Sequence, residues 1–416
     1  MPNLYSVVST FKKRTMNTFD RILAILNTIF LYLAIWLIPL TPGTVIWKLY
    51  KTKKGIVKLI NRDLICDSQT LMNLAKSTKP LDQFTNSFSP FVPLFILEYN
   101  KQCRQRRDVF SYAYNQILTN LEQLHTIDMK LESMQGDILW KIYEIMFRTG
   151  FELIFHRTPT NDEFNDMFPG VVDINKIIKR YTSFPDMPVR QKLYNRLLKL
   201  INENNPNFIL HNHQGFQELD ELSQVSLIGE DLLITICIQC TDLLCHMLVL
   251  YSEHSHEFQV NLDNCINETL RLYPLTDLWV RQASNKKQRG WIASLVQLNR
   301  NGWTNPDVFF ADRWNSDEHP PLLSWGFDMR RCPAKKFGTD IVKLVFETIT
   351  KRDGFWIEPA SNFDHERTFP FGCQVWIGYG QRSNDTLTWQ FNNKLQMQIR
   401  RWIFEKIRII DQFELN

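Results

Sequence analysis

Apolar residues recur at every third or fourth position along most of the chain after residue 43, and this spacing restricts it to a mainly helical fold. Turns rich in Pro, Gly and Asn separate the helical segments, and no long linker, internal repeat or low-complexity tract divides them. The predicted helices span Asp108 to Leu124, Asp137 to Phe155, Val189 to Asn202, Glu230 to Tyr251, Glu257 to Leu272 and Ala334 to Thr350. The predicted strands are short, at Trp291 to Leu298 and Gln374 to Tyr379. We therefore expect residues 44–392 to form one large, mainly α domain with small β-sheets.

The segment before this domain has the properties of a membrane anchor. The run from Ile22 to Leu40 is uncharged, and its 19 residues nearly span a hydrocarbon core of ~30 Å. The run is long for the apolar part of a signal peptide and no small-residue cleavage site follows it, although a buried core helix has the same composition. We predict that residues 1–43 hold a single transmembrane helix at about 22–40 and a hinge at Pro42 and Gly43. Basic residues flank both ends, so charge leaves the orientation open.

Charge and cysteine usage exclude some classes of protein. The net charge of +4 over 416 residues gives no support for nucleic-acid binding. The eight cysteines are scattered, several of them in apolar helical runs, which indicates reduced thiols in a compartment such as the cytosol. Residues 393–416 form an extension in which Asn393 to Gln412 reads as a basic amphipathic helix. This helix either packs on the domain or contacts a membrane surface.

The segment from Ser324 to Gly338 carries the clearest chemistry, because a Gly-containing loop leads to Cys332 and then directly into a helix. A cysteine at this place lies near the positive end of the helix dipole, and Arg330 and Arg331 precede it. Both effects favour a thiolate that can bind a soft metal centre. The alternative is a buried structural cysteine.

This loop resembles the haem-binding loop of the cytochrome P450 family, Phe-x-x-Gly-x-Arg-x-Cys-x-Gly followed by a helix. Trp325 takes the aromatic place, and Arg330 lies two residues before Cys332, as in the family. Asp328 and Ala334 depart from the pattern, because they stand where the family has glycines. The resemblance implies that Cys332 is the axial ligand of a haem iron, with Arg330 in the cofactor-binding loop.

Two upstream segments resemble further motifs of the family. Glu268 and Arg271 form a Glu-x-x-Arg pair, which alone is common on helix surfaces. The segment from Asn305 to Trp314 resembles the family segment that completes this pair with an arginine, here Arg313. The resemblance implies a buried network that holds the cysteine loop. It also places Arg281 as the partner of a haem propionate, whereas the residues alone allow a surface arginine at a strand edge.

The segment that aligns with the oxygen-activating helix of the family departs further from the family pattern. The family's Ala-Gly-x-Asp/Glu-Thr pattern aligns with Cys237 to Thr241, so that Thr241 remains as the catalytic hydroxyl and Cys240 replaces the acid. A zinc site at the cysteines of this segment is disfavoured, because a continuous helix cannot bring four ligands together.

The resemblance implies a haem-thiolate monooxygenase that contains haem b and oxidises an apolar, lipophilic small molecule with O2. No dinucleotide-binding glycine fingerprint is present, so electrons would come from a separate NAD(P)H-dependent reductase or a ferredoxin. In a eukaryotic cell the expected location is the endoplasmic reticulum membrane, single-pass, with the catalytic domain in the cytosol. The missing acid leaves a peroxide-using or rearranging enzyme as an alternative, and the missing glycines leave a non-catalytic haem or ligand-binding protein.

Overall fold

The structure of the protein is a computed structural model. It describes residues 56–58, 62–75, 78–80, 90–91, 101–121, 135–178, 185–203, 205–276, 278–283, 290–326, 331–358 and 375–380, together with Ile22 and Leu26. The predicted anchor at 22–40 lies outside these residues, apart from Ile22 and Leu26, which are helical and exposed. The predicted hinge and the extension at 393–416 also lie outside them.

The fold is mainly helical, as the spacing of apolar residues predicts. The helices are α4 (Ser68–Ala75), α6 (Lys101–Asn120), α8 (Ile138–Phe155), α9 (Asn161–Ile178), α10 (Met187–Asn202), α11 (Gln214–Gln217), α12 (Glu221–Ser226), η4 (Leu227–Cys240), α13 (Thr241–Val260), α14 (Leu262–Leu272), α15 (Leu295–Leu298), η5 (Ala311–Asn315), η6 (Leu323–Trp325) and α16 (Lys335–Thr350). η4 is a π-helix, and η5 and η6 are 3₁₀-helices.

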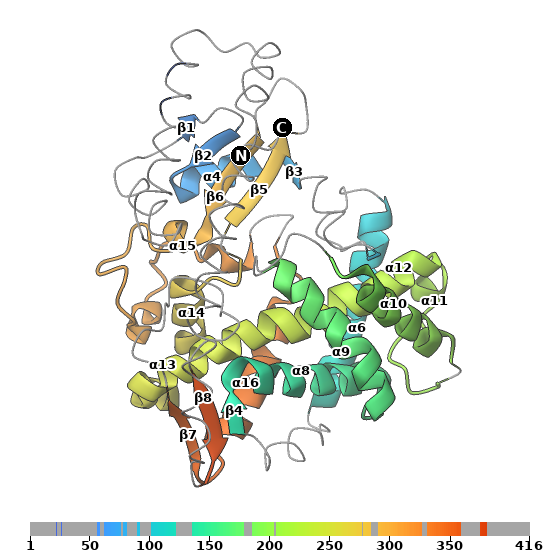
Figure 1. The fold of residues 1–416 in the computed structure, drawn as a ribbon. Coiled ribbons are helices and arrows are strands. Elements are labelled where there is room, and N and C mark those ends of the chain that lie inside the picture. Colours follow the sequence, from blue (N-terminus) through green and yellow to red (C-terminus); the bar gives the residue numbers. More distant parts are fainter. Residues whose placement is uncertain are drawn as a thin grey trace.

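Two small sheets lie at opposite ends of the helical body (Figure 1). The first has the order β1-β2-β6-β5-β3, and the second has the order β4-β8-β7. Their strands are β1 (Ile56–Lys58), β2 (Arg62–Ile65), β3 (Thr78–Pro80), β4 (Gln135–Asp137), β5 (Leu278–Ala283), β6 (Gly290–Ser294), β7 (Phe355–Glu358) and β8 (Trp376–Tyr379). Only β2 and β6 pair in parallel among these strands; the other pairings are antiparallel. Each sheet therefore joins segments that are far apart in the chain.

Polar caps explain where several helices begin. The Asp137 side chain accepts a hydrogen bond from the N–H of Trp140 at the start of α8, and Asp186 does the same for Val189 at the start of α10. The Asn261 side chain accepts from the N–H of Asn264, so this one residue ends α13 and begins α14. These caps satisfy N–H groups that lack partners within a helix.

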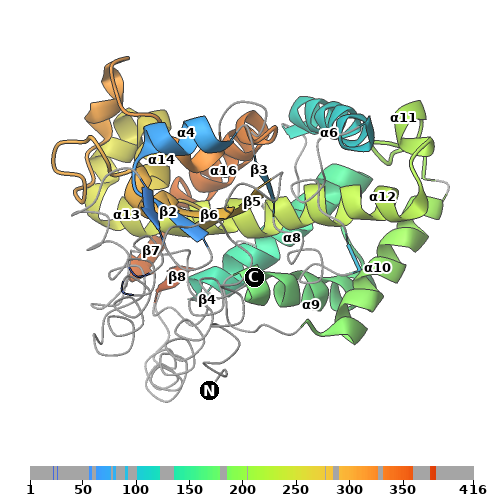
Figure 2. The same cartoon turned by 90° about the horizontal axis from the view of Figure 1, so that it is seen from above.

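A long apolar helical segment, Glu221–Val260, combines α12, η4 and α13 and crosses the middle of the molecule (Figure 2). Among the described residues, this is the one helical segment that is long and apolar enough to cross a membrane. However, 89% of its most apolar 18-residue stretch is buried inside the protein. It is therefore the central core helix. It packs against α8, where Gly150 allows close approach to Leu233 and Ile236.

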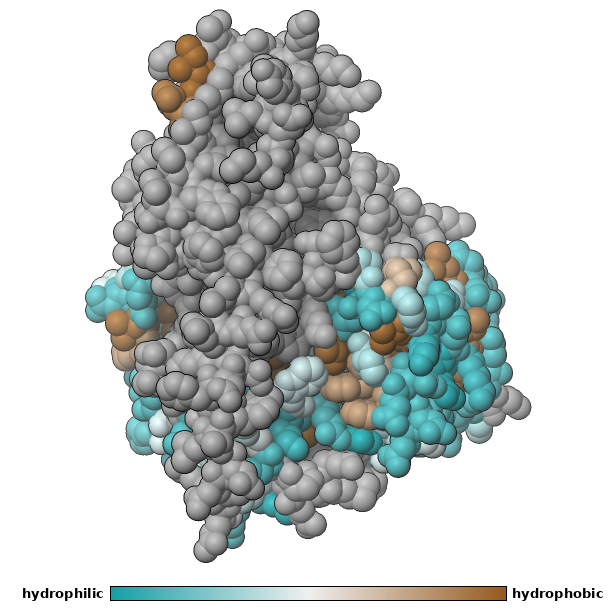
Figure 3. Space-filling model, viewed as in Figure 1, coloured by the Kyte–Doolittle hydropathy of each residue, from teal (hydrophilic) through white to brown (hydrophobic). Residues whose placement is uncertain are grey.

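The outer face of the helical body is mostly hydrophilic where it is described, over α10 to α12 at the right of Figure 3. Hydrophobic residues on this face form small separate groups and not one broad patch. Small separate groups of exposed hydrophobic side chains are common on protein surfaces.

The structure differs from the predicted elements at several places. The helix predicted from Glu257 to Leu272 is divided at Asn261, whose φ of −148° is not helical. The strand predicted from Trp291 to Leu298 ends at Ser294, and its last residues form α15. Helix α9 was not predicted; it contains Pro169, a residue that normally counts against a helix interior.

Candidate functional site

The cysteine loop is closed by its own backbone. Cys332 N–H donates a hydrogen bond of 2.7 Å to the carbonyl oxygen of Trp325, and α16 begins three residues later at Lys335. Gly326 follows Trp325 with a φ of +68°, a conformation that favours glycine. The loop thus sets the partly buried Cys332 just before the N-terminus of a long helix.

The electrostatics of Cys332 differ from the expectation based on Arg330 and Arg331. Burial raises the pKa of the Cys332 thiol, whereas a hydrogen bond from the backbone of Ala334 and the charge of Arg107 lower it. The net pKa is raised, so burial outweighs the other two effects and the free thiol is neutral. Arg107 belongs to α6 and Arg331 is exposed, while Arg330 lies outside the described residues.

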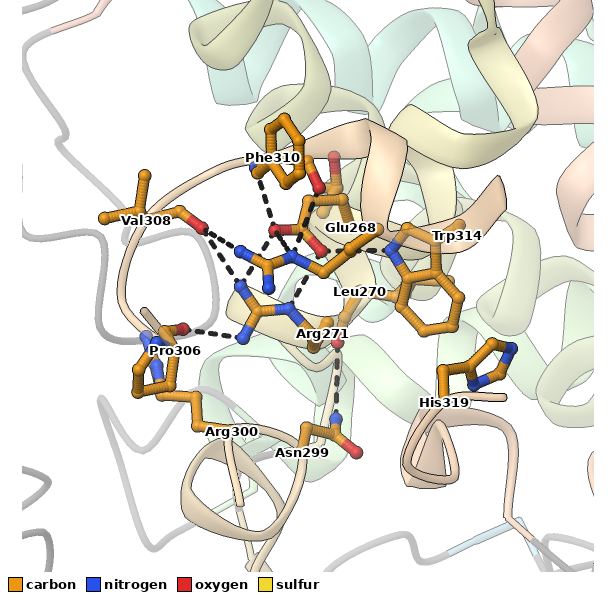
Figure 4. A network of polar contacts seen from close by, with 12 residues as sticks. Glu268, Leu270, Arg271, Asn299, Arg300, Pro306, Val308, Phe310, Trp314 and His319 are labelled. Carbon is orange, nitrogen blue, oxygen red and sulfur yellow. Dashed lines mark hydrogen bonds and ion pairs between the residues drawn. The ribbon is translucent and has the colours of Figure 1, made fainter. Parts of the chain in front are cut away.

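Glu268 and Arg271 lie together in a buried network (Figure 4). Arg313 joins this network through an ion pair with Glu268. Glu268 Oε1 accepts hydrogen bonds from Arg271 Nη2 at 2.8 Å and Arg313 Nε at 3.0 Å. It also accepts from the backbone N–H of Phe310 at 3.0 Å. Oε2 accepts from Arg271 Nε at 2.8 Å and Trp314 Nε1 at 3.0 Å. Both oxygens of this fully buried carboxylate are therefore saturated with donors.

The remaining arginine donors bind backbone carbonyls of the 304–308 loop. Arg271 Nη1 donates to Pro306 O at 2.6 Å, and Arg313 Nη1 donates to Thr304 O at 3.0 Å. Both guanidinium groups donate to Val308 O. Two cations with one carboxylate would leave a buried positive charge, and these carbonyl dipoles offset it.

A second set of hydrogen bonds joins α14 to the start of the cysteine loop. Ser324 Oγ donates to Leu270 O at 2.7 Å, and Asn299 Nδ2 donates to Ser324 Oγ at 2.7 Å. Asn299 Oδ1 accepts from Leu323 N–H at 2.8 Å. Leu270 precedes Arg271 in α14, and Leu323 and Ser324 belong to η6. The Glu268 network is thus mechanically connected to the loop that ends at Cys332.

Thr241 and Cys240 lie at the junction of η4 and α13. Thr241 is fully buried, and its hydroxyl has no hydrogen-bond partner in the part of the chain that the structure describes. Burial, with a smaller effect of Cys332, raises the pKa of the Cys240 thiol to about 12. A Cβ atom on Gly338 of α16 would lie 3.7 Å from Cys240 Sγ, so this thiol faces the helix that follows Cys332.

The structure places Arg281 only through its backbone. It lies in β5, opposite Pro80 of β3 and Trp291 of β6. Its side chain is outside the described part of the structure, so its role toward a propionate stays a prediction, as does the role of Arg330.

Several residues near these positions were missed by sequence reasoning. The charge of Arg107 lowers the pKa of Cys332, and the indole N–H of Trp314 donates a hydrogen bond to Glu268. Arg106 of α6 forms a buried ion pair with Asp231 of η4, next to the buried Glu230. The basic run at residues 104–107 could have indicated that α6 supplies arginines to the core. A buried arginine needs an acidic partner, so such a run predicts an ion pair with another element.

Comparison with known proteins identifies the fold. No family model matches the chain. The chain is 22% identical over 138 residues to the cytochrome P450 monooxygenase nodW of Hypoxylon pulicicidum, and the match spans 27% of this chain and 25% of that protein. It superposes on cytochrome P450EX alpha with myristic acid at a TM-score of 0.60 and 12% identity, covering 82% of this chain and 93% of that one. For cytochrome P450 Eryk from S. erythraea the TM-score is 0.61 at 14% identity, with 82% and 97% covered. The chain has the cytochrome P450 fold, and part of it is similar in sequence to a cytochrome P450; both findings agree with the resemblance.

Proposed function

We propose that this chain is a haem-thiolate oxidoreductase in which Cys332 is the axial ligand of the haem iron. The main support for this proposal is the position of Cys332 on a loop just before α16. Hydrogen bonds of Ser324 and Asn299 join this loop to α14, which carries Glu268. A ligand must keep its geometry through turnover, and a loop supported in this way provides it.

The chemistry of the donor set fits a haem iron. The Cys332 sulfur accepts a backbone hydrogen bond from Ala334 and feels the charge of Arg107, and both stabilise an anionic sulfur. Burial keeps the unligated thiol protonated, and coordination to a metal removes that proton. Arg281 and Arg330 are the proposed cofactor-binding arginines. When bound, haem b supplies the oxidising chemistry, and the thiolate favours cleavage of an O–O bond.

The proposed reaction is the monooxygenation of a lipophilic small molecule with O2 and electrons from a separate NAD(P)H-dependent reductase or a ferredoxin. The name of the matched relative, a monooxygenase, and the myristic acid in one similar structure support this reaction class and substrate class. Arg331, Lys335 and Lys336 are exposed at the start of α16 and offer a basic surface to an acidic electron donor.

A peroxide-using or rearranging enzyme is the second candidate, and Cys240 favours it. At neutral pH a thiol with a pKa of about 12 cannot replace the carboxylate that the family has beside its threonine. Thr241 is the proposed catalytic hydroxyl in the monooxygenase, and it has no required role in this alternative. Turnover with peroxide and without reductase distinguishes the two reactions.

The proposed organisation is a membrane anchor and hinge at residues 1–43, a haem domain at 44–392 and a C-terminal extension at 393–416. The uncharged run at 22–40 supports a single-pass location with the haem domain in the cytosol, at the endoplasmic reticulum in a eukaryotic cell. Deleting residues 1–42 is expected to release the protein from membranes with its haem binding intact.

The test of the haem-thiolate assignment is the carbon monoxide difference spectrum of the reduced, purified protein. Wild type is expected to show the thiolate-type band, and Cys332→Ala is expected to lose it. Cys66→Ala, at a buried cysteine at the end of β2, is the matched control and is expected to keep the band. A thiolate band in Cys332→Ala, or its absence from haem-loaded wild type, contradicts the assignment.

A further inference from the structure

A buried carboxyl group stands in η4 without a full set of partners. Glu230 is 4% exposed, and its Oε2 atom has no hydrogen-bond partner among the described residues. The neighbouring Gly229 packs tightly, because a Cβ atom there would lie 2.7 Å from Leu197 and 2.8 Å from Phe91. The carboxyl therefore sits in a closely packed part of the core, where an unpartnered charge is costly.

The charges around Glu230 are already paired with one another. Asp231 forms an ion pair with Arg106 of α6, and Arg190 of α10 pairs with Asp173 of α9 at 2.6 Å. These two pairs are neutral in sum, so Glu230 is the odd acid of the cluster. Burial and the charge of Asp231 raise the pKa of Glu230, Arg190 and Arg106 oppose them, and the result is about 8. Glu230 carries its proton at neutral pH.

The charged residues of α8 and α16 are not among those that shift the pKa of Glu230. α8 meets η4 through Gly150 against Leu233 and Ile236. α16 contributes Gly338 beside Cys240. The charges that act on Glu230 thus come from its own helix, α6 and α10.

The cluster is connected to the cysteine loop through Tyr114 of α6. The Tyr114 hydroxyl donates to the carbonyl oxygen of Asp231 at 3.3 Å, and its ring stacks on Phe337 of α16 at 4.3 Å. Burial raises the pKa of Tyr114, and electrostatic interactions with Cys332, Cys240 and Asp231 raise it further. One side chain therefore lies within electrostatic range of both the thiol and the acidic cluster.

The groups expected to supply a proton on this helix cannot do so. Cys240 has a pKa of about 12, and the hydroxyl of Thr241 is hydrogen-bonded to no described acid. Asp231 is committed to Arg106. We propose that Glu230 is the acid of this site, a buried carboxyl that holds the exchangeable proton that neither Cys240 nor Thr241 can release. This inference rests on the proposed function.

The chemical step is a simple ionisation. The O–H bond of the Glu230 carboxyl breaks, a water molecule accepts the proton as hydronium, and the charges of Arg106 and Arg190 favour the carboxylate that remains. A proton from solvent restores the acid. No electrons are transferred at Glu230.

The first test is an infrared pH titration of the purified full-length protein. Wild type is expected to show the carbonyl stretch of a protonated carboxyl that disappears with a midpoint near pH 8, and Glu230→Gln is expected to lack this band. Glu257→Gln is the control, because Glu257 lies exposed near the end of the same long helical segment. If Glu230→Gln keeps the band, or wild type lacks it, the proposal is overturned.

The second test is the ferric absorption spectrum of the haem-loaded protein over the same pH range. A transition near pH 8 in wild type and in Glu257→Gln, lost in Glu230→Gln, shows that the site senses this proton. Equal titration curves for all three proteins overturn the role of Glu230. If wild type binds no haem, the proposed function fails by itself, and the infrared titration still decides whether Glu230 holds a proton.

Discussion

Two buried glutamates of this protein have opposite surroundings. Glu268 is 0% exposed and Glu230 is 4% exposed, so burial does not distinguish them. Both oxygens of Glu268 accept hydrogen bonds from arginine, indole or backbone donors. Glu230 has an oxygen without a described partner, and the nearest arginines are paired with aspartates.

The number of hydrogen-bond donors around each buried carboxyl separates a group that stabilises the fold from one that can exchange a proton. A carboxylate that accepts hydrogen bonds at both oxygens holds together the segments that carry its donors. A carboxyl that is short of donors keeps its proton at neutral pH and can exchange it. We therefore propose that Glu268 supports the scaffold of the cysteine loop and that Glu230 exchanges a proton. The predictions below test this contrast.

The largest expected effect is that of Glu268→Ala, which leaves two buried guanidinium groups without their carboxylate. We expect a loss of about 3–5 kcal/mol in the free energy of unfolding and little haem-loaded protein. Urea unfolding and the haem content of purified protein measure the two effects. Glu257→Gln should change neither, and wild-type stability in Glu268→Ala would mean that the network does not support the fold.

Glu230→Gln is expected to act in the opposite direction. The pKa of Glu230 in the folded protein, about 8, lies above its usual 4.5, so the folded state holds this proton more tightly than the unfolded state. The carboxyl therefore lowers stability progressively as pH rises from about 4.5 to 8, with no further loss above pH 8. Glutamine removes this cost, so the variant should gain on the order of 4 kcal/mol at pH 8 and nothing at pH 4. Thermal unfolding at both pH values measures it, and a loss of stability at pH 8 would reverse the contrast with Glu268.

The contrast also shows what sequence reasoning can reach. The Glu-x-x-Arg spacing and the segment around Arg313 predicted that Glu268 would meet two arginines, because family motifs and helical spacing carry that information. The donors from Phe310 and Trp314 could not be predicted, since they depend on how the 304–314 loop folds back over α14. The motif predicts the partners that lie on it, and the rest of the network depends on tertiary structure.

Glu230 was beyond sequence reasoning for a similar reason. In the sequence it is a charged residue at the start of an apolar run, and such residues are commonly exposed helix ends. Its burial depends on how α6 and α10 dock on η4 and bring Arg106 and Arg190 close to it. The mainly helical fold was predictable from periodicity, but α9 was missed, because Pro169 weakens the helical signal of that segment.

Trp314→Phe tests the saturation of Glu268 with a smaller change. The variant keeps an aromatic ring beside Trp303 and His319 but loses the N–H that donates to Glu268 Oε2 at 3.0 Å. A hydrogen bond to a charged group is worth about 1.5–3 kcal/mol, and urea unfolding should show a loss at the lower end of that range. Trp303→Phe is the matched control, because the Trp303 N–H has no partner in the described structure. An equal loss in both variants would assign the effect to ring packing.

The smallest expected effect concerns a third glutamate, Glu163, whose environment resembles that of Glu268 at a more exposed place. Its carboxylate accepts from Arg157 Nη2 at 2.6 Å and from the N–H of Thr160 at 2.8 Å, while Thr160 Oγ1 accepts from the N–H of Glu163. This reciprocal pair is a capping box at the start of α9.

Arg157 and Thr160 hold the pKa of Glu163 at about 2, below its usual 4.5. The sign is therefore the reverse of that for Glu230. The stabilisation is fully present above about pH 4.5 and is lost as pH falls toward 2. Because the Arg157 side chain is 37% exposed, solvent screens the pair, and Glu163→Gln should cost only about 1 kcal/mol at pH 7. The cost should shrink as the unfolding measurement is repeated at lower pH. A cost that stays constant down to pH 3 would mean that Glu163 stabilises the protein through packing of its side chain. The relation between the number of hydrogen-bond donors and the direction of the pKa shift would then rest on Glu230 alone.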